Sequence, residues 1–190
     1  QARTTEQYRA VLGSNLEEYE RLARMIGDML FLAKADNGLI VPRQEDIDLA
    51  REVAELFDFY EALAEDKAVK LAVDGVARVS GDRLMLRRAL SNLISNAIRY
   101  TPRESDVHVR LHEADRQACI RIDNPCAELA EDPERLFDRF YRADPARRET
   151  SEGTGLGLAI ARSIVRAHGG EVSALRSRTG LSFVVSLPAS

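Results

Sequence analysis

Between Tyr8 and Ala33 the apolar side chains recur at alternating spacings of four and three residues. The positions are Tyr8, Leu12, Asn15, Tyr19, Leu22, Ile26, Met29 and Ala33. This spacing is the seam of a heptad repeat. Val11, Leu16, Ala23 and Leu30 widen the seam into a stripe, and such a stripe needs a second neighbouring helix to cover it. The pattern therefore predicts one long helix that packs in a helical bundle.

Asn15 is the single polar residue of this seam. It either fixes the register of the bundle at some cost in stability or occupies a partly hydrated position near the end of the bundle. Asp36-Asn37-Gly38 tolerates positive φ, and Pro42 follows, so the helix is expected to stop there. We place a domain boundary at this point, with residues 1–36 before it, a linker over 37–44 and a second domain over 45–190.

Size and composition exclude several classes of protein. The chain has 190 residues, of which 45% are hydrophobic, and a net charge of -4. It can bury a core, and it lacks the basic excess of most nucleic-acid-binding proteins. It has no apolar run long enough for a membrane helix and no signal-peptide pattern, and its start at Gln1 suggests a fragment of a longer protein. Cys119 and Cys126 are expected to be reduced thiols of an intracellular protein.

The second domain alternates between helical and strand patterns. Helices are predicted over 48–66, from Gly81-Asp82 to Thr101-Pro102, and over 156–167. Strands are predicted over 69–73, 77–80, 107–111, 119–122, 171–176 and 182–187. Helices on one face of a mixed, mostly antiparallel sheet make an α+β fold, a two-layer sandwich preceded by the long N-terminal helix.

Asn92, Asn96 and Arg99 interrupt the apolar face of the second predicted helix of this domain. Their spacings of four and three place them on one stripe, where carboxamides and a cation can hold a hydrated Mg²⁺ and the phosphates that it bridges. Taken alone, Asn-x-x-x-Asn is more often two surface or capping residues. The pattern becomes a specific signal for a phosphate site because Tyr100-Thr101-Pro102 directly follows Arg99.

A polar stretch over 125–154 contains Arg139, Arg142, Arg147 and Arg148 and ends in Gly153-Thr154-Gly155-Leu156-Gly157-Leu158. Glycines let backbone N–H groups turn toward an anion, and a helix N-terminus adds partial positive charge. A preceding strand, which a dinucleotide-binding fingerprint needs, is absent, and so is the Lys-Ser/Thr ending of a Walker loop. The stretch is therefore a candidate triphosphate site.

Together, Asn92 to Tyr100, Leu136 to Arg142 and Gly153 to Leu158 resemble the N, F and G2 boxes of the sensor histidine kinase catalytic domain. The resemblance implies a Bergerat-type ATP-binding fold over 45–190, and it identifies 1–36 as part of the second helix of the dimerisation and phosphotransfer hairpin. The runs over 28–36 and 82–90 resemble the heavy-metal, copper-responsive branch of that family.

The resemblance also implies site residues. Asn96 would ligate Mg²⁺ with support from Asn92, Arg99 would meet phosphate, and Asp123 would accept a hydrogen bond from the adenine amino group. The other residues implied to bind nucleotide or to anchor the lid over it are Tyr100, Phe137, Phe140, Arg142, Gly153, Thr154, Gly155, Leu156, Gly157 and Leu158.

One box departs from the family pattern Asp-x-Gly-x-Gly. Here the chain has Asp123-Asn124-Pro125-Cys126-Ala127, so Pro125 and Ala127 fill both glycine positions. Proline fixes φ and alanine resists positive φ, and the first hinge of the lid is therefore expected to differ.

Three functions follow as alternatives. Related ATPases of the gyrase and chaperone kind carry a general-base Glu four residues before the Mg²⁺-binding Asn. This chain has Asn92 at that position. Because a carboxamide cannot take a proton, hydrolysis of ATP is disfavoured. A histidine kinase that binds Mg²⁺-ATP and donates the γ-phosphate is favoured. The altered box at Asp123 favours instead a degenerate dimerisation or docking module.

The acceptor of the phosphoryl group is not expected among His108, His112 and His168, because none has an acidic neighbour on a heptad helix. His168, before Gly169, is expected to cap a helix C-terminus. The phosphoacceptor histidine is therefore predicted to lie upstream of Gln1. The resemblance further implies a homodimer, a response regulator receiver domain as partner, and a cytoplasmic region of an inner-membrane sensor protein.

Overall fold

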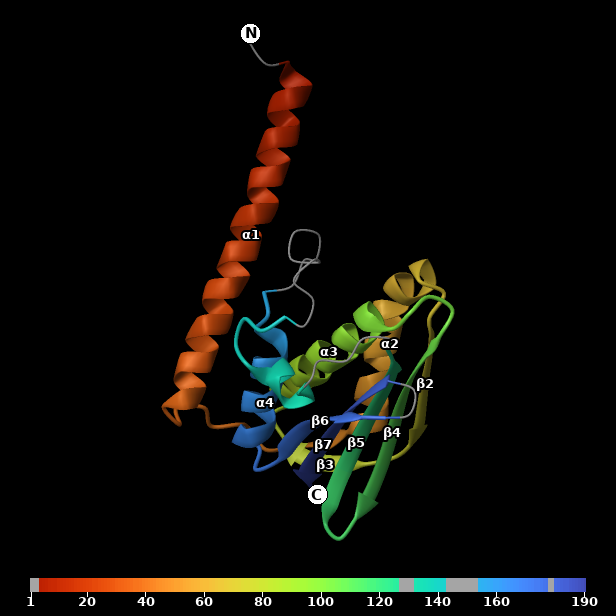
Figure 1. Ribbon diagram of the computed structural model, residues 1–190. Coiled ribbons are helices and arrows are strands. Elements are labelled where there is room, and N and C mark those ends of the chain that lie inside the picture. Colours follow the sequence, from red (N-terminus) through yellow and green to blue (C-terminus); the bar gives the residue numbers. More distant parts are fainter. Residues whose placement is uncertain (1–3, 127–131, 143–153, 178–179) are drawn as a thin grey trace.

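The computed structural model describes residues 4–126, 132–142, 154–177 and 180–190, and consists of a long helix that projects from an α+β domain (Figure 1). The long helix is α1 (Thr5–Asp36). The domain follows in the order β1 (Glu45–Asp48), α2 (Leu49–Asp66), β2 (Lys70–Gly75), β3 (Arg78–Gly81), α3 (Arg83–Tyr100), β4 (Asp106–Ala114), β5 (Gln117–Pro125), the 3-10 helix η1 (Pro133–Phe137), α4 (Gly157–Ala167), β6 (Glu171–Arg176) and β7 (Gly180–Pro188).

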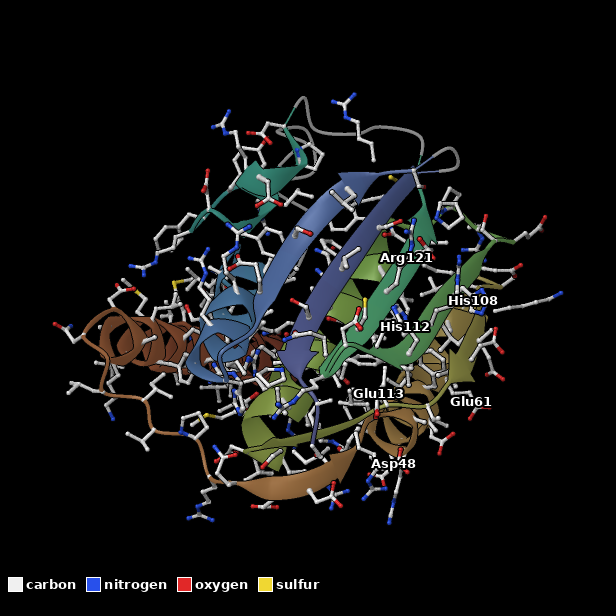
Figure 2. The ribbon with its side chains drawn as sticks, turned by 90° about the horizontal axis from the view of Figure 1, so that it is seen from below. Asp48, Glu61, His108, His112, Glu113 and Arg121 are labelled. Atoms are coloured by element: carbon white, nitrogen blue, oxygen red, sulfur yellow. The ribbon has the colours of Figure 1, made fainter. Side chains whose placement is uncertain are left out.

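The main sheet has the strand order β2-β4-β5-β7-β6. Only β2 and β4 pair in parallel, and the other neighbours are antiparallel. The helices α2, α3 and α4 lie behind one face, and the other face is open to solvent (Figure 2). This confirms the predicted two-layer sandwich with a mixed, mostly antiparallel sheet.

The strands β2 and β3 flank the turn at Gly75 but do not pair with each other. β3 pairs instead with β1, in register Ile47 to Val79, as a separate two-stranded sheet. The strand β1 has the sequence Glu-Asp-Ile-Asp, and so carries no alternating apolar signal from which it could be predicted.

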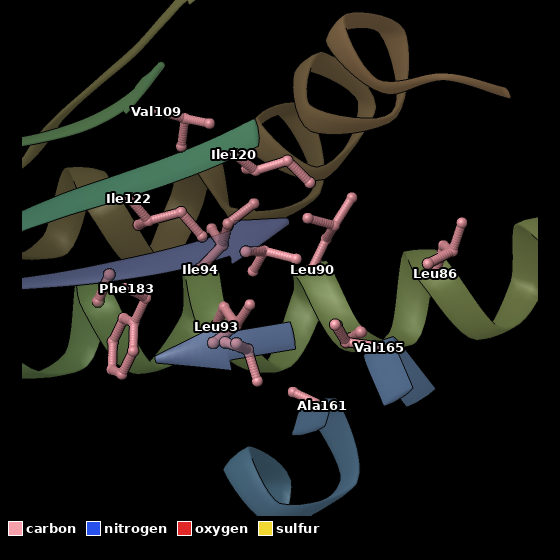
Figure 3. Packing of buried hydrophobic residues seen from close by; sticks show 14 of the residues in the cluster. Leu86, Leu90, Leu93, Ile94, Val109, Ile120, Ile122, Ala161, Val165 and Phe183 are labelled. Atoms are coloured by element: carbon pink, nitrogen blue, oxygen red, sulfur yellow. The ribbon is translucent and has the colours of Figure 1, made fainter. Parts of the chain in front are cut away.

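The core lies between α3 and the helix-facing side of the sheet. On β5 the side chains of Ala118, Ile120, Ile122 and Asn124 are buried, whereas the residues between them are only partly buried. Leu90, Leu93 and Ile94 of α3 pack against Ile120, Ile122 and Phe183, and Ala161 and Val165 of α4 lie beside α3 (Figure 3). The packing therefore fixes α3 and α4 against the sheet along most of their length.

The start of α3 is fixed by its predicted N-cap and by His168. The Asp82 carboxylate accepts a hydrogen bond from the Met85 N–H at 3.1 Å, and this bond lowers the pKa of Asp82. The Asp82 N–H donates to Nε2 of His168 at 3.0 Å, and Nδ1 of that ring contacts the Ile164 carbonyl at 2.8 Å. His168, the C-cap residue of α4, therefore joins the end of α4 to the start of α3.

The end of α3 is held by Lys67, which follows α2. Its Nζ donates to the carbonyl oxygens of Ile98, Arg99 and Thr101 at 2.9, 2.7 and 2.6 Å. A cation at a helix C-terminus is favourable because the helix dipole is negative there.

The seam of α1 faces solvent. Leu12, Tyr19 and Ile26 are among its exposed apolar side chains. The other side of the helix meets the domain near its C-terminus, where Leu32 is buried and the Arg88 guanidinium lies 4.8 Å from the Phe31 ring centroid. Among the described residues, no helix has the length and apolar character needed to cross a membrane.

Candidate functional site

The polar stripe predicted on α3 meets the start of α4. A Cβ atom on Gly157 would lie 3.3 Å from Oδ1 of Asn92, so only glycine lets α4 approach this side chain without crowding. The other amide atom of Asn92, Nδ2, is buried and has no hydrogen-bond partner among the described residues. Burying an unpaired donor costs about 1–3 kcal/mol, so the site is incomplete as it stands.

The N-terminus of α4 lacks a side-chain cap. Its N-cap residue is the fully buried Leu156, whose side chain makes no capping hydrogen bond. The Leu156 N–H itself lies 3.3 Å from the Thr154 hydroxyl. Free N–H groups at the start of a helix of this length attract anions. Thr154, Leu156, Gly157 and the buried Leu158 therefore form one turn that can face a phosphate.

The predicted lid anchors lie beside this turn. Phe137, at the end of η1, is buried and packs edge-on against Phe183, with ring centroids 6.1 Å apart. Phe140 is exposed, but its N–H donates to the Gly155 carbonyl at 2.9 Å. Gly155 has φ +71° and approaches Phe140 so closely that a Cβ would lie 2.9 Å from the Phe140 Cα. Phe137 therefore anchors η1 by its side chain, and Phe140 is held by its backbone.

The remaining stripe residues lie along α3 beyond Asn92. Asn96 and Arg99 are half-buried and Tyr100 is exposed. Within the described ranges, neither the Asn96 amide nor the Arg99 guanidinium forms a hydrogen bond or ion pair inside the chain, which leaves both available to a ligand. Arg142 is half-buried and lies at the end of the described lid segment.

Asp123 lies apart from these residues. It sits on the open face of the sheet, opposite Ser182 of β7 and His108 of β4. Its carboxylate accepts hydrogen bonds from Arg110 at 2.6 Å, from Arg121 at 2.9 Å and from the Ser182 hydroxyl. Burial acts to raise the pKa of Asp123, but the Ser182 hydroxyl and the two guanidinium groups hold it below its usual value.

Two buried polar residues of this region were given no ligand-binding role in the sequence analysis. Asn124 is 2% exposed, and its Oδ1 has no hydrogen-bond partner in the described part of the chain. Oγ1 of Thr101, the buried C-cap residue of α3, also has no hydrogen-bond partner there. The alternation in Cys119 to Ile122 carries the signal for Asn124, because its continuation places residue 124 on the buried face.

Some predicted residues lie outside the described ranges. They are Gly153, Ala127, Arg147 and Arg148.

The histidines lie away from α3's stripe. His108 and His112 share the open face of the sheet (Figure 2), and Nε2 of His108 contacts Asp74 at 2.5 Å. His168 has the capping position predicted for it. Among the described residues, no group of three or more His, Cys, Asp or Glu side chains is placed to hold a metal ion.

The residues present fit a hydrated Mg²⁺ bound together with a polyphosphate. Mg²⁺ keeps several waters and needs one or two protein oxygen ligands rather than a cage, and the Asn96 amide can supply one. The unpaired Asn92 amide and the uncapped turn of α4 are donors that can contact the phosphates.

Comparisons with known proteins identify the family of the chain. The chain is 50% identical over 191 residues to the sensor histidine kinase CusS of Escherichia coli K12, covering all of this chain and 40% of that protein. It also matches the structure of the Acinetobacter baumannii histidine kinase AdeS (TM-score 0.80, 21% identity, 95% of this chain and 85% of that one). A third match is full-length ShkA in complex with AMPPNP (TM-score 0.83, 22% identity, 100% of this chain and 40% of that one).

The match to CusS and to related curated sensor kinases confirms the resemblance to sensor histidine kinases and to their metal-responsive branch, and the two solved structures share the fold. The chain spans about two fifths of the length of the curated relatives that it matches first. Residues 81–190, from the N-cap region of α3 to the end of β7 and beyond, match the model of one family. The chain therefore belongs to the histidine kinase-, DNA gyrase B- and HSP90-like ATPases.

Proposed function

We propose that this chain binds Mg²⁺-ATP and donates the γ-phosphate to a histidine on a dimerisation helix outside its 190 residues. In this proposal residues 45–190 are the ATP-binding domain, 37–44 are a linker, and 1–36 are part of the second helix of the dimerisation hairpin. The observation that carries the proposal is the unpaired Asn92 amide against Gly157, at the uncapped start of α4.

Each polar residue of the stripe has a distinct task. Asn96 holds Mg²⁺, which when bound neutralises charge on the phosphates. Asn92 donates to a phosphate oxygen, and Arg99 approaches the phosphates from about two turns further along α3. The first turn of α4 supplies backbone N–H groups, while Gly153 extends the glycine loop and Arg142 adds positive charge. Tyr100 packs beside the nucleotide.

Positioning and charge neutralisation then supply most of the catalysis. A nitrogen of the acceptor imidazole forms a bond to the γ-phosphorus while the bond to the bridging oxygen breaks. ADP leaves with that electron pair, and the imidazole proton passes to solvent. Asn92 cannot act as a general base toward water, so the bound ATP is preserved until the imidazole arrives.

The whole protein is proposed to be a homodimeric sensor of the heavy-metal-responsive branch, with this region on the cytoplasmic side of the inner membrane. Its phosphohistidine would pass the phosphoryl group to an aspartate of a response regulator. These proposals rest on the similarity to sensor histidine kinases.

Calorimetric titration with Mg²⁺-ATP tests the binding step. We expect saturable binding to the wild-type chain and at least about tenfold weaker binding for Asn96→Asp, because the change replaces a neutral ligand by a charge beside the phosphates. Asn15→Asp is the matched control, since it makes the same change on α1. Absence of saturable binding at millimolar ATP would refute the proposal.

Labelling with [γ-³²P]ATP tests the transfer step. The chain alone should retain no label, and addition of a purified CusS hairpin that carries its phosphoacceptor histidine should yield acid-labile label on the hairpin. Label on His108, His112 or His168 would contradict the proposed acceptor.

A further inference from the structure

The last residues of β5 place two neighbouring polar side chains on opposite faces of the sheet. Asp123 lies on the open face, on the same side as Arg121 and His108 (Figure 2), and Asn124 lies on the face that α3 covers. Successive side chains of a strand alternate in this way, so only one of the two can reach a ligand held between α3, α4 and the sheet.

The carboxylate of Asp123 is already engaged. Arg110 contacts Oδ2, and Arg121 and Ser182 both contact Oδ1. These groups come from β4, β5 and β7, so the carboxylate ties three adjacent strands together. A ligand on the helix-facing side would have to compete with two guanidinium groups for a side chain that points away from it.

Asn124 is in the reverse situation. Its side chain is almost fully buried, and its neighbours on the same face are apolar: Ile122 on its own strand and Leu181 opposite it on β7. Oδ1 has no hydrogen-bond partner among the described residues. An unpaired acceptor in such surroundings is destabilising, and a ligand that donates a hydrogen bond would remove that cost.

The direction of the elements places Asn124 near the phosphate-facing stripe. Leu90 lies over Ile120 and Ile94 over Ile122, so α3 and β5 run the same way (Figure 3). Two residues further along, Asn124 therefore lies toward the C-terminal end of α3. This is the end that carries Asn96, Arg99 and the second unpaired buried oxygen, Oγ1 of Thr101.

We propose that Asn124, and not Asp123, recognises the base of the nucleotide. Its Oδ1 accepts a hydrogen bond from the exocyclic amino group of a 6-aminopurine, and Asp123 holds the strands together from the other face. The inference rests on the proposed function, and it names adenine nucleotides as the ligand through a carboxamide acceptor.

Three ligands and two variants test this assignment. The ligands are Mg²⁺ complexes of ATP, of purine riboside triphosphate, which lacks the 6-amino group, and of inorganic tripolyphosphate. The variants are Asn124→Leu, which keeps the side-chain volume among apolar neighbours, and the control Asp123→Asn on the open face. Dissociation constants are measured for each combination.

We expect Asn124→Leu to weaken ATP binding about tenfold, the equivalent of one lost hydrogen bond, and to leave tripolyphosphate binding within about twofold. The wild-type chain should bind purine riboside triphosphate more weakly than ATP by a similar factor. Asn124→Leu should bind the two nucleotides with equal affinity, because the substitution and the loss of the 6-amino group delete the same contact. Asp123→Asn should keep the preference for ATP over purine riboside triphosphate.

The unchanged tripolyphosphate affinity shows that Asn124→Leu is folded, and the comparison of ligands on the wild-type chain needs no variant at all. Loss of the 6-amino preference in Asp123→Asn, or its persistence in Asn124→Leu, would overturn the assignment. A wild-type chain that binds neither ATP nor tripolyphosphate would instead overturn the proposed function.

Discussion

Arg139, in the segment that follows η1, binds Asp36, the last residue of α1. Its Nη2 lies 2.6 Å from Oδ1 and 2.7 Å from Oδ2 of the carboxylate. Both side chains are about half exposed, and exposed ion pairs contribute about 0–1 kcal/mol because water and salt screen them. The contact joins the long helix to the segment that holds Phe140.

We predict that Asp36→Asn loosens this junction with little effect on global stability. The change in free energy of unfolding should stay below about 1 kcal/mol, while amide exchange should become faster over the last turn of α1. Hydrogen exchange with mass spectrometry measures the last turn of α1 and the rest of the chain in one experiment. Glu18→Gln, which removes the Arg21 pair within α1, is the control. Unchanged exchange at the junction in Asp36→Asn would contradict the prediction.

The N-cap of α3 gives a prediction about pH. The Met85 N–H lowers the pKa of Asp82 in the folded chain below its ordinary value of 3.8. A lowered pKa stabilises the folded state at pH values above 3.8, and this contribution is lost as the pH falls through the folded-state value. Asp82→Ala should therefore cost about 1 kcal/mol at neutral pH and progressively less below pH 3.8.

Urea denaturation at several pH values measures this difference. Asp82→Asn is the matched control because asparagine also caps helices but cannot ionise. It should keep the stability of the wild type at neutral pH, and it should become the more stable of the two at acidic pH, where Asp82 takes up a proton and the asparagine cannot. A constant cost of Asp82→Ala across the whole pH range would contradict the role of the carboxylate.

Local patterns predicted much of this domain. The alternation in Val107 to Leu111 and in Cys119 to Ile122 identified β4 and β5, and Asp82 was predicted as a cap. Contacts between distant segments could not be predicted in the same way, because nothing in Glu45 to Asp48 indicates that it pairs with β3. The parallel pairing of β2 with β4 is of the same kind, since the α3 helix separates them in sequence.

The candidate site likewise contains features that the sequence predicts and features that depend on contacts between distant segments. The polar stripe of α3 was predicted from its spacing and was linked to the glycine turn by the family resemblance, and the structure places Gly157 beside Asn92. Asp123 was assigned by its place in a motif, which does not state toward which face a side chain points. The face is decided by the pleat of β5 and by Arg110 of the neighbouring strand.

Gly155 gives a prediction about the glycine turn. Its φ of +71° is unfavourable for other residues, and a Cβ there would meet the Phe140 backbone. Gly155→Ala should therefore cost about 1–2 kcal/mol locally and weaken Mg²⁺-ATP binding. Gly27→Ala is the control: no atom lies within 4 Å of its added Cβ, and alanine in a helix is favoured by up to about 1 kcal/mol. Equal ATP affinity of wild type and Gly155→Ala would contradict the proposed cradle.

The exposed seam of α1 gives a prediction about assembly. Leu16 is 60% exposed and Ile26 is 58% exposed, on the stripe whose width requires neighbouring helices. We predict that the chain self-associates through this stripe and that Leu16→Glu shifts it toward the monomer in sedimentation velocity. Leu84→Glu is the control, because Leu84 is 77% exposed at the start of α3, outside the stripe. Equal dissociation by both variants would show that general loss of apolar surface, rather than the seam, governs association.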